Sequence, residues 1–158
     1  MDLSDYRADA DLQRDGVSVP FGSFTEIVIR SASDEKFVNY WNRMKKPYRR
    51  EIAAEKLPTA TGRELLAKTI AQRMVLGWTF LVIPKSMFDE DFKESTLESK
   101  PAKHKDFEVP MVEISYSKKN CFILLNHENY GTFRGWIMEQ AGEISTFQNK
   151  DFEDDLGN

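Results

Sequence analysis

The stretch TGRELLAKTIAQRMVLGWTFLVI, residues 61–83, decides the predicted fold because its hydrophobic pattern changes along its length. As far as Trp78 the apolar residues recur every three or four positions, which is typical of one face of an amphipathic helix. Residues 79–83 are mostly apolar and are followed by Pro84, which favours a short strand. The sequence therefore predicts a helix over about 59–78 and a strand directly after it.

A strand and two shorter helices are predicted before this stretch. Residues 25–29 are mostly β-branched and follow turn-forming residues, which favours a strand. Ser33 is the expected N-cap of a helix whose apolar side chains share one face and which ends at Pro47. A second helical segment is expected over about 48–57, where another proline follows.

Beyond the strand the periodicity disappears, and a long polar stretch follows. We expect residues 85–110 to form a loop insertion that contributes little to the core. Alternating apolar and polar residues over 111–116 predict a half-buried strand that pairs with 79–83 as a hairpin. Ser117 is the expected N-cap of a short apolar helix, and an apolar stripe over 130–147 predicts the last helix.

Length and charge indicate a single globular domain with acidic ends. The chain has 158 residues and a formal net charge of −4, and a domain of this size can bury a core without disulfides or metals. We expect a flexible acidic arm over 1–16, one globular domain over 17–149 and an acidic tail over 150–158. The predicted fold class is α+β and mostly α-helical, with a short N-terminal strand, a β-hairpin and disordered acidic termini.

The composition also excludes several classes of protein. A pI near 5.3 argues against a protein that coats nucleic acid through its overall charge. A single cysteine, Cys121, excludes an internal disulfide framework and indicates a reducing compartment. The apolar runs are far shorter than the ~18 residues of a membrane span, and the acidic start differs from a basic signal peptide. We therefore expect a soluble cytoplasmic protein without a membrane partner.

The residue types that could form a catalytic, metal or cofactor site do not form one in this sequence. Cys121, His104 and His127 are the only soft ligands, and their spacing fits no zinc motif. Cys121 lies in an apolar run and is expected to be buried and inert, while His127 is expected to cap a turn. The glycines form no phosphate-binding loop. The sequence therefore favours a protein that is not an enzyme and needs no cofactor.

One concentrated basic cluster lies in the first half of the chain. Arg43, Lys45, Lys46, Arg49 and Arg50 follow one another closely, with aromatic residues interleaved, and the last four of them are the predicted partner-binding residues. One interpretation is a nucleic-acid site, in which the cations contact phosphates and the aromatic rings stack on bases. The favoured interpretation is a surface that contacts an acidic protein partner, including the acidic tails of other copies of this chain, or that serves only solubility.

Dispersed hydrophobic, basic and turn positions also follow a distinctive order along the chain. In sequence they are Phe24, Ile29-Arg30, Phe37, Lys45-Lys46-Pro47-Tyr48-Arg49-Arg50, Gly77-Trp78, Tyr116-Ser117, Asn120, Leu124-Leu125, Phe133, Ile137, Ala141 and Phe147. This order resembles that of the tail assembly chaperones of long-tailed bacteriophages, which are small, mostly helical proteins. The resemblance covers roughly residues 24–147. It departs from the family at 81–110, where family members have a short hairpin and this chain has a long charged insertion.

The resemblance implies a non-enzymatic role in viral morphogenesis. Such chaperones bind the tape measure protein, keep this long helical chain soluble and recruit tail tube subunits around it. They act in the host cytoplasm and are not part of the mature virion. Two other functions stay open from the sequence: a structural tail or head–tail adaptor protein, and a small nucleic-acid-binding regulator that uses the basic cluster.

Overall fold

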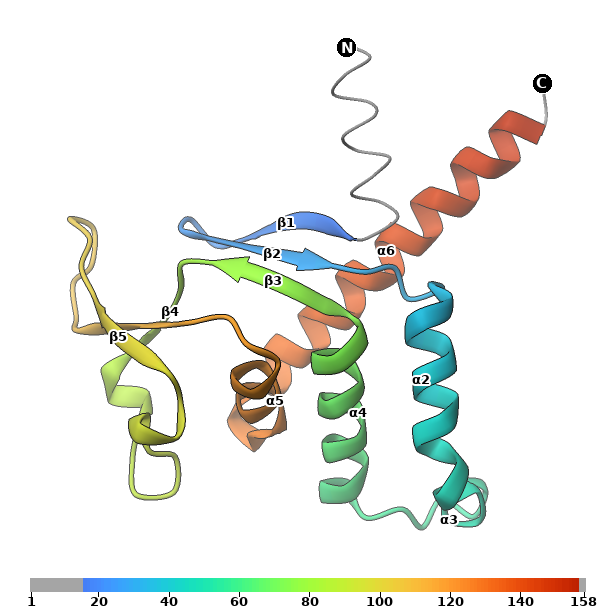
Figure 1. Cartoon of the computed structure of the whole chain (residues 1–158), viewed down its shortest axis with the longest axis horizontal. Helices are drawn as coiled ribbons and strands as arrows, with labels where there is room; N and C mark the ends of the chain where they lie inside the picture. Colours follow the sequence, from blue (N-terminus) through green and yellow to red (C-terminus); the bar gives the residue numbers. More distant parts are fainter. Residues whose placement is uncertain (1–15, 157–158) are drawn as a thin grey trace.

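Two three-stranded antiparallel sheets and a set of helices make up the part of the chain that the structure describes (Figure 1). This computed structural model describes the backbone of residues 16–156 and the side chains of residues 16–148. The flexible arm predicted over 1–16 lies outside the described residues except for Gly16. The side chains of the acidic tail predicted over 150–158 also lie outside them, although its backbone is helical as far as Leu156.

The first sheet has the strand order β1-β2-β3. β1 (Val17–Phe21) and β2 (Thr25–Ile29) form a hairpin, and β3 (Val75–Thr79) pairs antiparallel with the other edge of β2. Gly22 in the hairpin turn has a φ of 69°, a left-handed conformation that glycine adopts without a steric penalty. The sequence pattern predicted only the middle strand of this sheet at its correct position.

The prediction that the long helix continues to Trp78 is wrong. α4 (Thr59–Arg73) ends five residues earlier, and Trp78 lies in β3 opposite Ile27. Its indole Nε1 donates a hydrogen bond to the Ile114 carbonyl at 2.7 Å, which ties β3 to the second sheet. Helical spacing and strand pairing both bury apolar residues here, and pairing with β2 prevails because it satisfies the backbone groups of both strands.

Two helices precede α4, as predicted, but the second ends four residues before the predicted end at 57. α2 (Glu35–Lys45) leads into the 3₁₀ turn η1 (Lys46–Tyr48) and then into α3 (Arg49–Ala53). The N-cap of α2 is Asp34 rather than the predicted Ser33, because an Asp34 carboxylate oxygen accepts the Lys36 amide hydrogen at 2.8 Å. α2 packs beside α4, and both helices lie on one side of the first sheet (Figure 1).

The second sheet contains the predicted hairpin together with an unpredicted strand. β4 (Leu81–Pro84) pairs antiparallel with β6 (Met111–Ile114), as expected from their alternation. β5 (Ser99–Ala102) pairs with the other edge of β6, which gives the order β4-β6-β5. Because β5 has the sequence SKPA, it carries no hydrophobic alternation from which a strand could be predicted.

The 85–110 insertion contributes to the core, contrary to the prediction. It contains two 3₁₀ turns, η2 (Lys85–Met87) and η3 (Glu94–Thr96), in addition to β5. Phe92 and Leu97 are only 5% and 6% exposed, and they pack in the second hydrophobic cluster. Because the insertion is mostly polar, its composition does not indicate that these two apolar residues anchor it to the core.

The last helices close the fold. α5 (Lys118–Asn126) has Ser117 as its N-cap, as predicted, and the 3₁₀ turn η4 (Glu128–Tyr130) connects it to α6 (Gly131–Leu156). Arg134 donates hydrogen bonds to the Leu125 and His127 carbonyls and so satisfies carbonyl groups at the end of α5. α6 packs against the first sheet and then extends beyond it (Figure 1).

The core consists of two hydrophobic clusters that share residues at their border. One cluster fills the space between the first sheet, α4, α5 and α6, and the other lies between the second sheet, the insertion and α5. Phe21, Trp78 and Tyr130 pack against both clusters. The two sheets are thus joined by aromatic side chains.

The predicted fold class, mostly α-helical with one short strand and a hairpin, is therefore wrong in its sheet content. The structure is a mixed α+β fold with two complete three-stranded sheets. Two of the unpredicted strands, β1 and β5, are edge strands that contain Pro20 and Pro101. Proline is tolerated at a sheet edge, where its missing N–H is not needed for pairing, but it weakens a strand prediction from sequence.

Candidate partner-binding surface

The predicted basic cluster lies at one end of the molecule, where α2 turns into α3. Pro47 is in the first turn of η1, a position where its missing N–H breaks no hydrogen bond. Lys46, Arg49 and Arg50 are exposed, and Lys45 is half-buried with its Nζ 5.2 Å from the centroid of the Trp41 ring. The local sequence therefore places the cations on a helix–turn–helix corner that faces solvent.

Three of the four predicted residues share one hollow, and the fourth does not. The hollow has a volume of about 430 Å³ and is lined by Asn42, Lys45, Lys46, Arg49, Ile52 and Ala53. Ile52 is 38% exposed and is the large apolar side chain of this hollow. Arg50 lies on the same corner but does not line the hollow. The site is thus an apolar residue surrounded by cations.

These cations are electrostatically unpaired within the described part of the chain. Among residues 16–148, none of Lys45, Lys46, Arg49 and Arg50 forms an ion pair with a carboxylate. Like charges held close together repel one another, and an acidic partner would relieve this repulsion. We call this corner the basic corner.

The sequence analysis missed a second cationic region, except for Arg43, which it placed in the basic cluster. A cleft of about 580 Å³ lies between α2 and α4, and five of its lining residues are cations: Arg30, Lys36, Arg43, Arg73 and Lys118. Arg43 and Arg73 each lie with the guanidinium carbon 5.1 Å from the centroid of the Tyr40 ring. Since α2, α4, α5 and the end of β2 all contribute, no local sequence signal marks this region. We call it the basic cleft.

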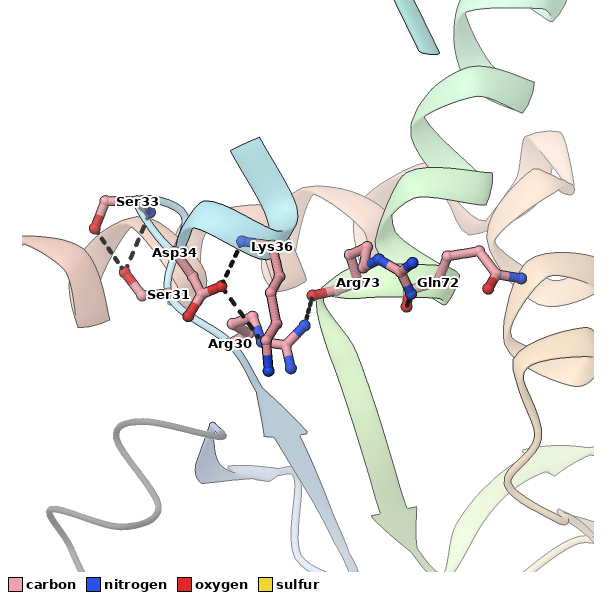
Figure 2. A network of polar contacts seen from close by, with 7 residues as sticks. All are labelled: Arg30, Ser31, Ser33, Asp34, Lys36, Gln72 and Arg73. Atoms are coloured by element: carbon pink, nitrogen blue, oxygen red, sulfur yellow. Dashed lines mark hydrogen bonds and ion pairs between the residues drawn. The ribbon is translucent and has the colours of Figure 1, made fainter. Parts of the chain in front are cut away.

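Arg30 is the buried member of the basic cleft. It is 7% exposed, and its Nη1 donates a hydrogen bond to the Arg73 carbonyl at 2.8 Å. Figure 2 shows Arg30, Asp34 and Lys36 gathered at the start of α2, with Arg73 opposite them at the end of α4. The Arg30 Nε lies 3.7 Å from an Asp34 carboxylate oxygen, too far for a hydrogen bond. This buried donor has no hydrogen-bond acceptor in the described structure.

The candidates for nucleophile and base have structural roles. Cys121 is 1% exposed, and burial raises the pKa of its thiol to about 12, so the thiol is protonated at neutral pH. The Nδ1 of His127 accepts the Asn129 amide hydrogen at 3.1 Å, which confirms the prediction that this residue caps a turn. His104 accepts the Asp106 amide hydrogen in the same way and packs against Phe107.

Two further types of site were searched for among the described residues. No group of three His, Cys, Asp or Glu side chains that could hold a metal ion occurs among them. None of the helices in the described part of the chain combines the length and the apolar character that crossing a membrane would require.

Most positions of the order that resembles tail assembly chaperones serve the fold itself. Trp78 and Tyr116 pack edge to face at 5.0 Å, and Tyr116 donates a hydrogen bond to the Val75 carbonyl. Buried Asn120 donates hydrogen bonds to the Glu98 and Ser115 carbonyls, and thereby anchors the insertion. Seven other positions are core residues: Ile29, Phe37, Leu124, Leu125, Phe133, Ile137 and Ala141.

Two parts of that order have no role in the core. They are the element at residues 45–50, which forms the basic corner, and Phe147 on α6, which is 57% exposed.

Comparison with known proteins identified no relative of this chain: no protein-family model, curated protein or solved structure matches it.

Proposed function

We propose that this protein is a tail assembly chaperone of a long-tailed bacteriophage that binds the tape measure protein and has no turnover activity. The observation that carries the proposal is the basic corner. Three of its four cations are exposed and none of the four forms an ion pair among residues 16–148, although most other positions of the chaperone-like order are satisfied within the fold. A surface element without a role in its own fold is available for a partner.

The chemistry of the basic corner indicates what such a partner presents. An exposed isoleucine surrounded by cations fits an apolar side chain on a helix that also carries carboxylates. A long tape measure helix with an apolar stripe presents this combination many times along its length. The net charge of −4 on the chaperone helps to keep such a complex dispersed, because like-charged complexes repel one another.

Co-expression with the tape measure protein encoded in the same genome tests the proposal. We expect this chain to move the tape measure protein from the pellet to the supernatant and to co-purify with it. Changing Lys45, Lys46, Arg49 and Arg50 to Glu should reduce co-purification at least about tenfold, because charge complementarity is inverted at the contact.

The matched control makes the same change of charge elsewhere. Lys85, Lys93, Lys103 and Lys105 are also exposed, and they are changed to Glu in the control variant. The control should bind as the unmodified chain does. Equal insolubility of the tape measure protein with and without this chain, and no co-purification, would refute the chaperone function. Loss of nucleic-acid binding alone in the first variant would support the regulator instead.

A further inference from the structure

Four cations of the basic cleft are at least partly exposed and have no carboxylate partner in the described chain. Lys36, Arg43 and Lys118 are exposed, and Arg73 is half-buried. None of these four forms an ion pair with a carboxylate among residues 16–148. The described lining of the cleft also contains no carboxylate. The positive charge of the cleft is therefore both accessible and largely uncompensated, which favours an anionic ligand.

Tyr40 holds two of these cations in place. The guanidinium carbons of Arg43 and Arg73 each lie 5.1 Å from the centroid of this one ring, a distance at which a cation is attracted to the ring face. Both arginines also line the cleft, so that neighbouring anionic groups of one ligand can contact them together. Arginine suits phosphate in particular, because its planar fork donates two parallel hydrogen bonds to phosphate oxygens.

A second hollow adjoins the basic cleft on the side of α5. It has a volume of about 340 Å³ and is lined by Glu64, Lys68, Gln72, Lys118, Lys119 and Phe122. Gln72 and Lys118 line both the cleft and this adjoining hollow. Phe122 is half-buried and supplies an aromatic ring, against which a flat organic group can stack. The neutral amide of Gln72 can both donate and accept hydrogen bonds.

We propose that the basic cleft and the adjoining hollow together bind an organic polyphosphate of the nucleoside diphosphate class. The phosphates contact Lys36, Arg43 and Arg73, and the organic group lies over Gln72 and against Phe122. The cleft volume of about 580 Å³ lies within the range of small-molecule sites, roughly 300–1,000 Å³. Since the glycines form no phosphate-binding loop, side chains rather than backbone amides hold the phosphates. This assignment is independent of the proposed function.

Amide chemical shifts of the full chain test the ligand class. Adenosine diphosphate (ADP), adenosine monophosphate (AMP), inorganic pyrophosphate and citrate are each added to the isotope-labelled protein, up to about 1 mM. We expect ADP to shift the amide signals of Lys36, Arg43, Arg73 and Phe122. It should bind at least about tenfold more tightly than AMP or citrate, because its second phosphate contacts further cations. Pyrophosphate should shift the signals of the three cations but not that of Phe122.

Two variants with the same change of charge decide whether the cations of the cleft are responsible. Lys36→Gln combined with Arg43→Gln removes two exposed cations of the cleft, and should weaken ADP binding at least about tenfold. Lys93→Gln combined with Lys103→Gln removes two exposed cations of the 85–110 insertion, and should leave the affinity for ADP unchanged. Circular dichroism checks that both variants are folded.

Four outcomes would overturn the proposal. The first three are no shift of the cleft amides with ADP, equal affinity for ADP and citrate, and equal affinity of the two variants for ADP. The fourth is an identical set of shifted signals with ADP and pyrophosphate, which would refute the contact of the organic group with Phe122. A single-stranded oligonucleotide that shifts the cleft amides where ADP does not would assign the cleft to nucleic acid instead.

Discussion

The basic corner and the basic cleft concentrate positive charge in opposite ways. In the basic corner four cations lie within six consecutive residues and are mostly exposed to solvent. In the basic cleft five cations from distant parts of the chain are brought together around Tyr40, and one of them is buried. The first region is a property of the local sequence, and the second is a property of the tertiary structure.

The two regions therefore differ in how much their cations contribute to the stability of the fold. Solvated cations in the basic corner contribute little to stability, so that their removal should affect partner binding alone. Cations in the basic cleft also hold the fold together, because Arg30 joins the loop after β2 to the end of α4. Substitutions there should therefore change stability.

The largest effect on stability is expected for Arg30→Ala. The substitution removes the hydrogen bond to the Arg73 carbonyl and the ion pair with Asp34, and it leaves a partly buried carbonyl without this donor. We expect the free energy of unfolding to fall by about 1–3 kcal/mol, measured by urea denaturation. Arg50→Ala, in the basic corner, is the matched control and should leave it nearly unchanged. An equal loss of unfolding free energy in the two variants would contradict the distinction between the basic cleft and the basic corner.

A smaller effect is expected at the ring between the cations of the basic cleft. Tyr40→Leu removes an aromatic face that contacts Arg43 and Arg73, and each contact contributes about 0.5 kcal/mol at a partly exposed site. The free energy of unfolding should therefore fall by about 1 kcal/mol. Tyr40→Phe retains the ring and should behave as the unmodified chain does. A loss of stability with Phe equal to that with Leu would show that the ring is not the stabilising feature.

The smallest effect is expected in the basic corner. The double substitution Lys46→Ala and Arg49→Ala removes two exposed cations that form no ion pair with the described residues. Thermal unfolding should change by less than about 0.5 kcal/mol, since exposed surface substitutions rarely exceed this value. A marked loss of stability would mean that the basic corner supports the fold, and would weaken the argument that it is a partner-binding surface.

The sequence predicted those elements whose pattern is local. The apolar face of α2, the Ser117 cap of α5 and the stripe of α6 each follow from spacing along a single helix. The pairing of β4 with β6 was also predicted, because the first strand is continuously apolar and the second alternates between apolar and polar residues. These predictions need no knowledge of the distant chain.

The missed elements depend on distant partners. The sequence pattern of β3 predicts the end of a helix, but in the structure β3 pairs with β2. The sequence of β5 predicts a polar loop, but in the structure β5 pairs with β6. Phe92 and Leu97 are isolated apolar residues in a charged stretch, and only the folded chain shows that they anchor the insertion. Propensity is a weak signal where sheet pairing supplies the stabilisation.

The same distinction between local pattern and distant contacts applies to the two cationic regions. The sequence determined the basic corner, because neighbouring residues on a short helical turn remain neighbours in any fold, although only the structure separates Arg50 from the hollow. Tertiary structure alone decided the basic cleft, in which Arg30, Arg73 and Lys118 converge from positions far apart in the chain. The physical reason is that charge spacing along a helix is set by local geometry, whereas packing of α2 against α4 is set by the shared core.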